Sequence, residues 1–210
     1  MEFEKLLRGL EKKPLIKVAY ELLRTDLSPT LKYHNFEHTR TVLREVVTFA
    51  LEDNLSAREI ELVAIAAAFH DTGYVLNGIE NEIHAAELSS EFMRKNKKYK
   101  KDEIVLVAQM ILDTQLRFID DVPRQISTIP LAGYLLDGDL GNFGRTDFFE
   151  KADLVRQETE NVETKQFYSN LLMFLKAHKW NTKAAVKLRS AQKALNIKAL
   201  EEKLNSGVFG

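Results

Sequence analysis

Two histidines stand one helical turn apart in the segment YHNFEH, residues 33–38, with an amide and a carboxylate side chain between them. A third histidine, His70, is followed directly by Asp71, and a later DGD segment contributes Asp137 and Asp139. Imidazole nitrogens and carboxylate oxygens form a ligand set suited to zinc, manganese, iron or magnesium, with positions left open for water and substrate. Cysteine is absent, so any metal must be held by nitrogen and oxygen. These residue types predict a divalent metal site.

The spacing of apolar residues predicts that these side chains lie on the core-facing sides of their helices. His34 and His38 share a face if both are helical, and Val42 continues that face inward. His70 lies on the apolar face of its own helix beside Asp71, and a buried imidazole and carboxylate are costly unless a partner satisfies them. Each histidine taken alone fits a hydrogen-bonded core position better than a ligand position. Their joint occurrence with the DGD segment favours the metal site.

The letters HNFEH, residues 34–38, also match the H-x-x-E-H pattern of one class of zinc metalloproteases, in which two histidines hold zinc and the glutamate acts as base. Five letters match easily by accident. A protease would leave the FHD segment, residues 69–71, without a role, and it gives no reason for a chain this short. The metalloprotease therefore stays a remote alternative.

Apolar residues recur at three- and four-residue spacing along the chain, as in Leu43, Val46 and Ala50, and do not alternate. The chain is 45% apolar, which suits one well-cored domain. We therefore predict an all-α fold, a single compact multi-helix bundle over residues 1–210, with a helical extension at residues 1–28.

Residue types mark where the helices begin and end. Asn35 is a suitable N-cap for the first histidine-bearing helix. Ser56 and Glu59 form a capping box for the second, which we expect to end near Gly73. The segment RFIDDVPRQISTIP, residues 117–130, is the least regular part of the chain, and irregular backbone beside acidic residues suits the rim of a site.

The charge balance and the apolar runs limit the class of partner. The chain has 30 basic and 31 acidic residues and a net charge of -1, which predicts no general attraction to nucleic acid or to an anionic membrane. Its densest apolar run, LVAIAAAF, is far shorter than a bilayer span. We therefore expect a soluble, cytoplasmic protein whose partner is a small molecule. The oligomeric state is open, a homo-oligomer included.

The order of these motifs resembles the HD superfamily of metal-dependent phosphohydrolases, whose hallmark is a histidine on one helix, a His-Asp pair on a later helix and a distant aspartate. The opening YHNFEHTRTV is similar to that of a bacterial branch of the superfamily and, in similar form, of cyclic-nucleotide phosphodiesterases. The resemblance implies an HD-domain-like helical bundle. It runs from about residue 30 to 195 and includes the segments AAAFHDTGY, NEIHAAELSSEF, MILDTQ, LLDGDLGNFGR and FLKAHKWNTKAA.

The resemblance also implies a role for each residue that matches a family position. The implied activity is hydrolysis of a phosphate ester, with a nucleotide or cyclic nucleotide as the expected substrate and a metal-activated water as nucleophile. Asp71 would bind the metal and orient that water. His34 would protonate the leaving oxygen, which an imidazole with an unperturbed pKa near ~6.5 can do. The implied metal ligands are His38, His70, Asp71 and Asp139.

One position departs from the family pattern. The acidic segment often begins with His-Glu, but here it begins with Asn81 and Glu82, and His84 is displaced by three positions. Because asparagine is a poor replacement for an imidazole ligand, the sequence favours one cation over two. Asn35 or Glu37 could hold the His34 imidazole, although both suit the start of a helix. The remaining candidates for an outer partner of the metal or a phosphate contact are Asp137, Arg145 and His178, each of which also suits a structural role.

Two alternatives come from other functional classes. A sensor or interaction module could bind a nucleotide on the same metal-stabilised fold without turning it over. A purely structural helical domain is the third hypothesis. Sequence patterns do not separate these hypotheses, because turnover depends on the three-dimensional geometry of the site, which the spacing of residues along the chain does not define.

Overall fold

The computed structural model describes residues 2–76, 78–159 and 161–207. Most of them are helical, which confirms the all-α prediction, and a single two-stranded hairpin is the sheet found in these ranges. In chain order the elements are α1 (Glu2–Glu11), α2 (Pro14–Thr25), α3 (Phe36–Glu52), α4 (Ala57–Phe69), the 3-10 helix η1 (Thr72–Val75), α5 (Asn81–Asn96), α6 (Lys101–Leu112), β1 (Arg117–Ile119), β2 (Val122–Arg124), α7 (Ala132–Asp139), the 3-10 helix η2 (Leu140–Gly144), α8 (Phe148–Glu158), α9 (Thr164–Ala177) and α10 (Lys183–Ser206).

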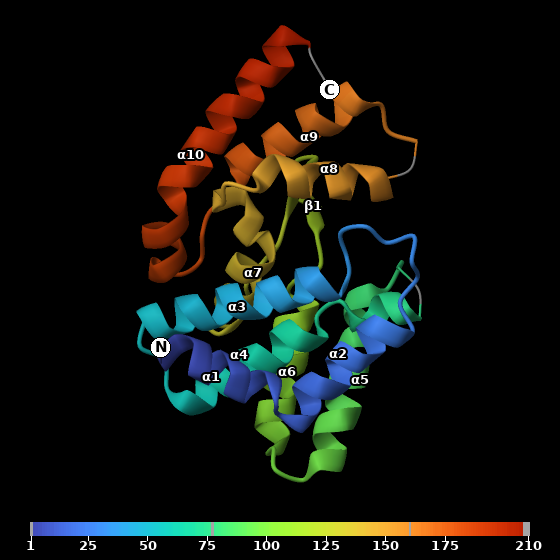
Figure 1. Ribbon diagram of the computed structural model, residues 1–210, viewed down its shortest axis with the longest axis vertical. Helices are drawn as coiled ribbons and strands as arrows, with labels where there is room; N and C mark the ends of the chain where they lie inside the picture. Colours follow the sequence, from blue (N-terminus) through green and yellow to red (C-terminus); the bar gives the residue numbers. More distant parts are fainter. Residues whose placement is uncertain (1, 77, 160, 208–210) are drawn as a thin grey trace.

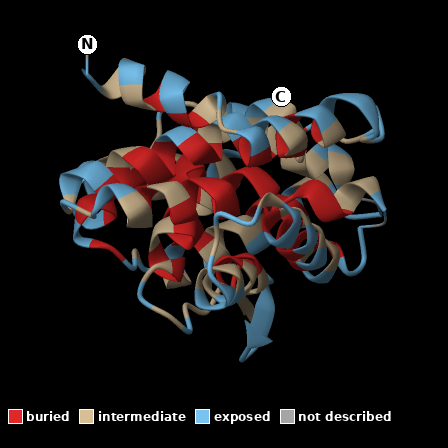
Figure 2. Cartoon of the chain, turned by 90° about the horizontal axis from the view of Figure 1, so that it is seen from below, coloured by how far each residue is buried: buried red, intermediate tan, exposed pale blue. Residues whose placement is uncertain are grey.

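The helices form two groups that meet across α7 and the hairpin. Figure 1 shows α1 to α6 in the lower group and α8 to α10 in the upper group. From Leu62 to Phe69, helix α4 is apolar on all sides and buried, as expected for the central helix of a bundle. Figure 2 shows the buried residues gathered in the interior, with exposed residues around the outside.

Each group of helices has its own apolar cluster. The larger cluster is built around α4 and takes in residues from α1 to α7. Leu7 and Ile16 belong to it, so the N-terminal helices pack into this core. The smaller cluster joins η2, α8, α9 and α10. Phe49 of α3 packs with Ala184 and Ala185 of α10 and links the two groups.

The predicted caps are present, and the second histidine-bearing helix ends earlier than predicted. The Asn35 side chain accepts hydrogen bonds from the backbone N–H groups of Glu37 and His38, so α3 begins after it and His34 lies outside the helix. The condition for a shared helical face, that both histidines are helical, is therefore not met. The capping box of Ser56 starts α4 as predicted. The helix ends at Phe69, before the expected Gly73, because the chain tightens into η1.

Gly73 allows a close approach that positions the site. A Cβ atom at this position would lie 1.9 Å from the carbonyl oxygen of Asn81, the first residue of α5. Only glycine lets η1 approach the start of α5 so closely. This contact brings Asn81 beside Asp71, which directly precedes η1.

The segment predicted to be irregular contains the hairpin. Strands β1 and β2 are antiparallel, with Arg117 opposite Arg124 and Ile119 opposite Val122. Asp120 and Asp121 form the two-residue turn with φ angles of 50° and 60°, a conformation that aspartate tolerates better than most residues. The strands are too short for an alternating pattern to mark them. Figure 2 shows this hairpin projecting from the body of the molecule.

Among the described residues, no helix combines the length and the apolar character needed to cross a membrane.

Candidate metal centre

Three of the predicted ligands meet at one point of the lower group. His38 lies in the first turn of α3, His70 caps the C-terminus of α4, and Asp71 follows it. One ligand atom from each of the three residues lies within 4.8 Å of the others. The Oδ2 atom of Asp71 is 3.1 Å from Nε2 of His70 and 3.4 Å from Nε2 of His38.

Asp139, the last residue of α7, reaches the same point. Its Oδ1 atom is 3.2 Å from Nε2 of His38 and 3.5 Å from Nε2 of His70. Its other oxygen accepts a hydrogen bond of 2.7 Å from the Gln125 side chain, which also donates to the carbonyl of Thr114. The four side chains implied as metal ligands therefore converge, and Gln125 orients the last of them.

The donor set and its hydrogen bonds fit a divalent cation. Nδ1 of His70 lies 2.8 Å from the carbonyl oxygen of Ala67, which requires a hydrogen on Nδ1 and leaves the lone pair of a neutral ring on Nε2. That nitrogen is 3.4 Å from Nε2 of His38. The nearby Oδ2 atom of Asp71 is buried and has no hydrogen-bond partner. Acceptor atoms that face one another without enough hydrogens are suited to a shared cation.

The pKa shifts of the clustered histidines and aspartates indicate that a positive charge between them is favourable. Burial disfavours a charged His70, but the carboxylates of Asp71 and Asp139 outweigh burial and raise its pKa well above the ordinary value. Burial dominates at His38 and lowers its pKa, although both carboxylates oppose the shift. The pKa of Asp71 is lowered because the neighbouring imidazoles outweigh its burial. The two carboxylates thus favour a positive charge beside them, on His70 when no cation is bound, and a divalent cation supplies such a charge.

His34 lies beside the cluster, held by a residue that the sequence did not indicate. Its Nδ1 atom is 2.5 Å from Oε2 of Glu158, at the C-terminal end of α8. The other carboxylate oxygen accepts the backbone N–H groups of Tyr33 and His34. The His34 ring stacks on Tyr74, with ring centroids 4.8 Å apart. No local pattern marks Glu158, because it lies 124 positions from its partner at the end of an ordinary polar helix.

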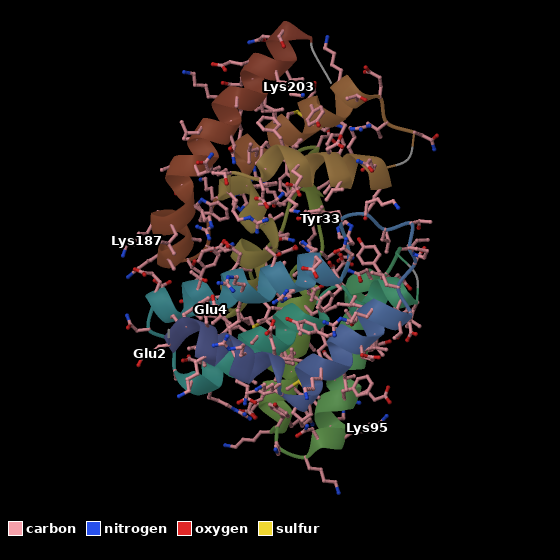
Figure 3. The ribbon with its side chains drawn as sticks, in the orientation of Figure 1. Glu2, Glu4, Tyr33, Lys95, Lys187 and Lys203 are labelled. Atoms are coloured by element: carbon pink, nitrogen blue, oxygen red, sulfur yellow. The ribbon has the colours of Figure 1, made fainter. Side chains whose placement is uncertain are left out.

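A cavity of about 300 Å³ opens beside these residues and extends between the two groups of helices. Tyr33, labelled in Figure 3, lines it at the junction of the groups. At one end it is lined by His34, Asp71, Asn81, Glu82, Gln125 and Asp139, and elsewhere mainly by apolar residues of the hairpin region, η2, α8 and α9.

The segment at the start of α5 contains three candidate site residues, Asn81, Glu82 and His84. The first two line this cavity. Nδ2 of Asn81 is 3.4 Å from Oδ1 of Asp71, and its buried Oδ1 atom has no partner. Burial and the carboxylates of Asp71 and Asp139 raise the pKa of Glu82. His84 does not line the cavity: its Nδ1 atom lies 4.0 Å from a carboxylate oxygen of Glu87.

Asp137 holds the start of α10 and not the metal cluster. Its oxygens accept hydrogen bonds from the backbone N–H groups of Asn181 and Thr182 and from both side chains. Burial raises its pKa even though these donors favour the charged form. Asp139, which the resemblance implies as the metal ligand, is the aspartate of the pair that lies beside the histidines, and its role as a ligand stays a prediction.

The other outer candidates are engaged elsewhere. Asn35 caps α3, and Arg145 forms two hydrogen bonds of 2.9 Å with Asp147. His178 packs against Phe143 and Trp180, and its Nδ1 atom lies 3.0 Å from Nζ of Lys193.

The geometry around Glu37 does not match the metalloprotease alternative. Glu37 is exposed in the first turn of α3, while Glu158 holds the non-helical His34. The segment HNFEH therefore does not form a helical pair of zinc ligands with a glutamate beside it.

Comparison with solved structures gives a match to the crystal structure of a predicted HD superfamily hydrolase from an uncultured Thermotogales bacterium. The two chains share 15% sequence identity, the match covers 94% of each chain, and the TM-score is 0.59. This chain has the fold of that protein. The HD-type fold implied by the motifs is thereby confirmed, while the roles of the site residues stay predictions. No protein-family model and no curated protein sequence matches the chain.

Proposed function

We propose that this chain is a metal-dependent phosphohydrolase that cleaves a phosphate ester. The observation that carries the proposal is the convergence of His38, His70, Asp71 and Asp139 beside His34 at one end of a single cavity. A divalent cation bound there would polarise the phosphoryl group and lower the pKa of a bound water. The four converging side chains would hold one cation. Asn81 stands where the family pattern often has a histidine, so an imidazole for a second cation is missing from that position.

The other residues of the site orient the reacting groups. Asn81 and Gln125 contact the outer oxygens of Asp71 and Asp139 and fix the direction of each carboxylate. Glu158 holds Nδ1 of His34, so Nε2 is the ring nitrogen available to protonate the leaving oxygen. The carboxylate of Glu158 also stabilises the charged ring before it gives up that proton.

Metal analysis of the purified protein, followed by a phosphate ester panel with Mn, Zn, Fe or Mg restored, tests this function. We expect one cation per chain, an increase in thermal stability on adding it, and hydrolysis that chelation abolishes. Asp71→Ala should lower kcat at least about 1,000-fold and reduce the metal content, because it removes a ligand and the group that orients water. Asp102→Ala, an exposed position on α6, is the matched control and should change neither quantity.

Unchanged activity and metal content in Asp71→Ala would overturn the proposal. A protein that binds phosphate esters with each of the four metals and forms no product would instead be a binding module. Full thermal stability after chelation, with no metal found by elemental analysis, would favour a structural domain.

A further inference from the structure

The walls of the cavity provide few groups for a second charged part of a substrate. Neither lysine nor arginine occurs among the described residues that line it. Its acidic side chains are Asp71, Asp139 and Glu82, and the first two balance a divalent cation. A second phosphate or a carboxylate on the substrate would therefore lie near Glu82 with no lysine or arginine to neutralise it, which is unfavourable in a partly buried site.

The cations nearest to this region are engaged in other contacts. A neighbouring cavity of about 510 Å³ shares Tyr33, Asp139 and Asn142 with the first and contains basic side chains. Arg145 is held by Asp147, as described above. The remaining basic side chains of that cavity are Lys151, paired with Glu150; Arg44, paired with Glu4; and Lys32, bound to the carbonyl of Pro29.

The end of the cavity away from the ligands is apolar. It is formed by Leu116, before the hairpin, Val155 of α8, and Phe167, Leu171 and Phe174 of α9. The one polar side chain that α9 contributes is Asn170, which is exposed and accepts a hydrogen bond from Gln166. A base edge or a ribose diol buried here would leave polar groups unpaired, whereas an aromatic ring or an aliphatic chain would not.

We propose that the substrate is a small phosphomonoester whose single phosphate lies at the metal end and whose uncharged, apolar alcohol fills the cavity between α8 and α9. This inference rests on the proposed phosphohydrolase function and names its substrate class. The apolar residues that line the cavity leave room for one organic group, which favours a monoester over a diester. At about 300 Å³ it is at the lower end of ligand-pocket volumes and suits an aromatic ring or a short aliphatic chain.

The reaction on such a substrate is a simple hydrolysis. The oxygen of water bonds to phosphorus, and the bond from phosphorus to the alcohol oxygen breaks. The electron pair of that bond takes the proton of His34, and the proton released by the attacking water restores the ring. The products are inorganic phosphate and the neutral alcohol.

The test compares esters of equal charge with the metal restored. We expect kcat/KM for benzyl phosphate and hexyl phosphate, whose leaving groups are alkoxides like that of glycerol phosphate, to exceed that for glycerol phosphate roughly 100-fold, because apolar surface is buried. Adenosine monophosphate should be poorer than either apolar ester, and adenosine diphosphate poorer still. Binding of benzylphosphonate, which is not hydrolysed, should exceed that of methylphosphonate by a similar factor in calorimetry.

Leu171→Lys is the matched gain-of-charge variant. Leu171 is half-buried, so a lysine can keep its amine near the cavity, and the preference for hexyl phosphate over adenosine diphosphate should fall at least about 10-fold. Val105→Lys, at an exposed position on α6, should preserve the wild-type preference.

The outcomes separate this inference from the proposed function. Asp71-dependent hydrolysis with equal use of polar and apolar esters, or with a preference for nucleotides, would overturn the substrate class and leave the phosphohydrolase standing. Absence of turnover together with tight benzylphosphonate binding would uphold the apolar site and overturn the enzyme. Equal binding of the two phosphonates would overturn the substrate class by itself.

Discussion

In the proposed function, the hydrogen bond between His34 and Glu158 would determine which nitrogen of the His34 ring acts on a substrate. Because Nδ1 is held at 2.5 Å from the carboxylate, Nε2 is the atom left for proton transfer. Burial alone would lower the pKa of His34, but the hydrogen bond to Glu158 and the charges of Asp71 and Asp139 outweigh burial and raise it. A ring that keeps its proton in this way suits a general acid, and its positioning depends on Glu158.

Glu158→Gln is expected to impair leaving-group protonation while it keeps the shape of the side chain. For hexyl phosphate, whose leaving alkoxide needs a proton, kcat should fall about 10- to 100-fold. For p-nitrophenyl phosphate, whose leaving phenolate is stable without a proton, the loss should stay within about 3-fold. Steady-state kinetics on both esters with the same metal measure the difference.

Glu150→Gln is the control for this experiment. Glu150 lies on the same helix and its side chain is 69% exposed, so the variant should leave both rates unchanged. An equal loss for the two esters in Glu158→Gln would mean that Glu158 only supports the backbone of Tyr33 and His34.

Helix α7 places its two aspartates in different environments. Residues two positions apart on an α-helix point to nearly opposite sides, since 3.6 residues make a turn. Asp139 therefore reaches the histidines of α3 and α4, while Asp137 reaches the start of α10. Gly138, between them, allows close packing: a Cβ atom there would lie 2.5 Å from a methyl group of Val46 in α3. The short helix thus links the candidate metal centre to the upper group of helices.

The pair Asp137→Asn and Asp139→Asn tests this division. In Asp137→Asn the amide cannot accept all the hydrogen bonds from Asn181 and Thr182, so the free energy of unfolding should fall by about 2–4 kcal/mol. Metal content should be retained. In Asp139→Asn the metal should be lost, while unfolding in urea with a chelator present should change by about 1 kcal/mol or less. Equal losses of stability in the two variants would contradict the assignment.

The sequence allows the helix starts and the converging histidines and aspartates to be predicted because both leave local patterns. Asn35 and Ser56 mark helix starts through side chains that reach only a few residues along the chain. Glu158 and Gln125 leave no such pattern, because their roles arise from long-range contacts that only the assembled fold creates. The hairpin was missed for a related reason: each strand has three residues, too few to show a period of two.

At the scale of the whole molecule, the cavity depends on the joining of the two helix groups. The lower group carries His38, His70 and Asp71, whereas the upper group supplies Glu158 and the apolar wall of α9. Their packing therefore positions the candidate metal ligands and shapes the cavity beside them. One half-buried residue of the upper group, His178, is expected to make the stability of this arrangement depend on pH.

Burial and the neighbouring Lys193 lower the pKa of His178 to about 3. In the unfolded chain the imidazole pKa is about 6.5, so between these values the unfolded state binds more protons than the folded state. The free energy of unfolding should therefore fall as the pH falls from about 6.5 toward 3, by as much as about 1.4 kcal/mol per pH unit from this group. His178→Gln keeps an acceptor for Nζ of Lys193 but does not titrate. Urea unfolding from pH 7 to 4, with a chelator present, should thus give a flatter dependence in the variant, because every other titrating group is common to both proteins. Parallel curves for the two proteins would show that His178 does not contribute to the acid sensitivity of the fold.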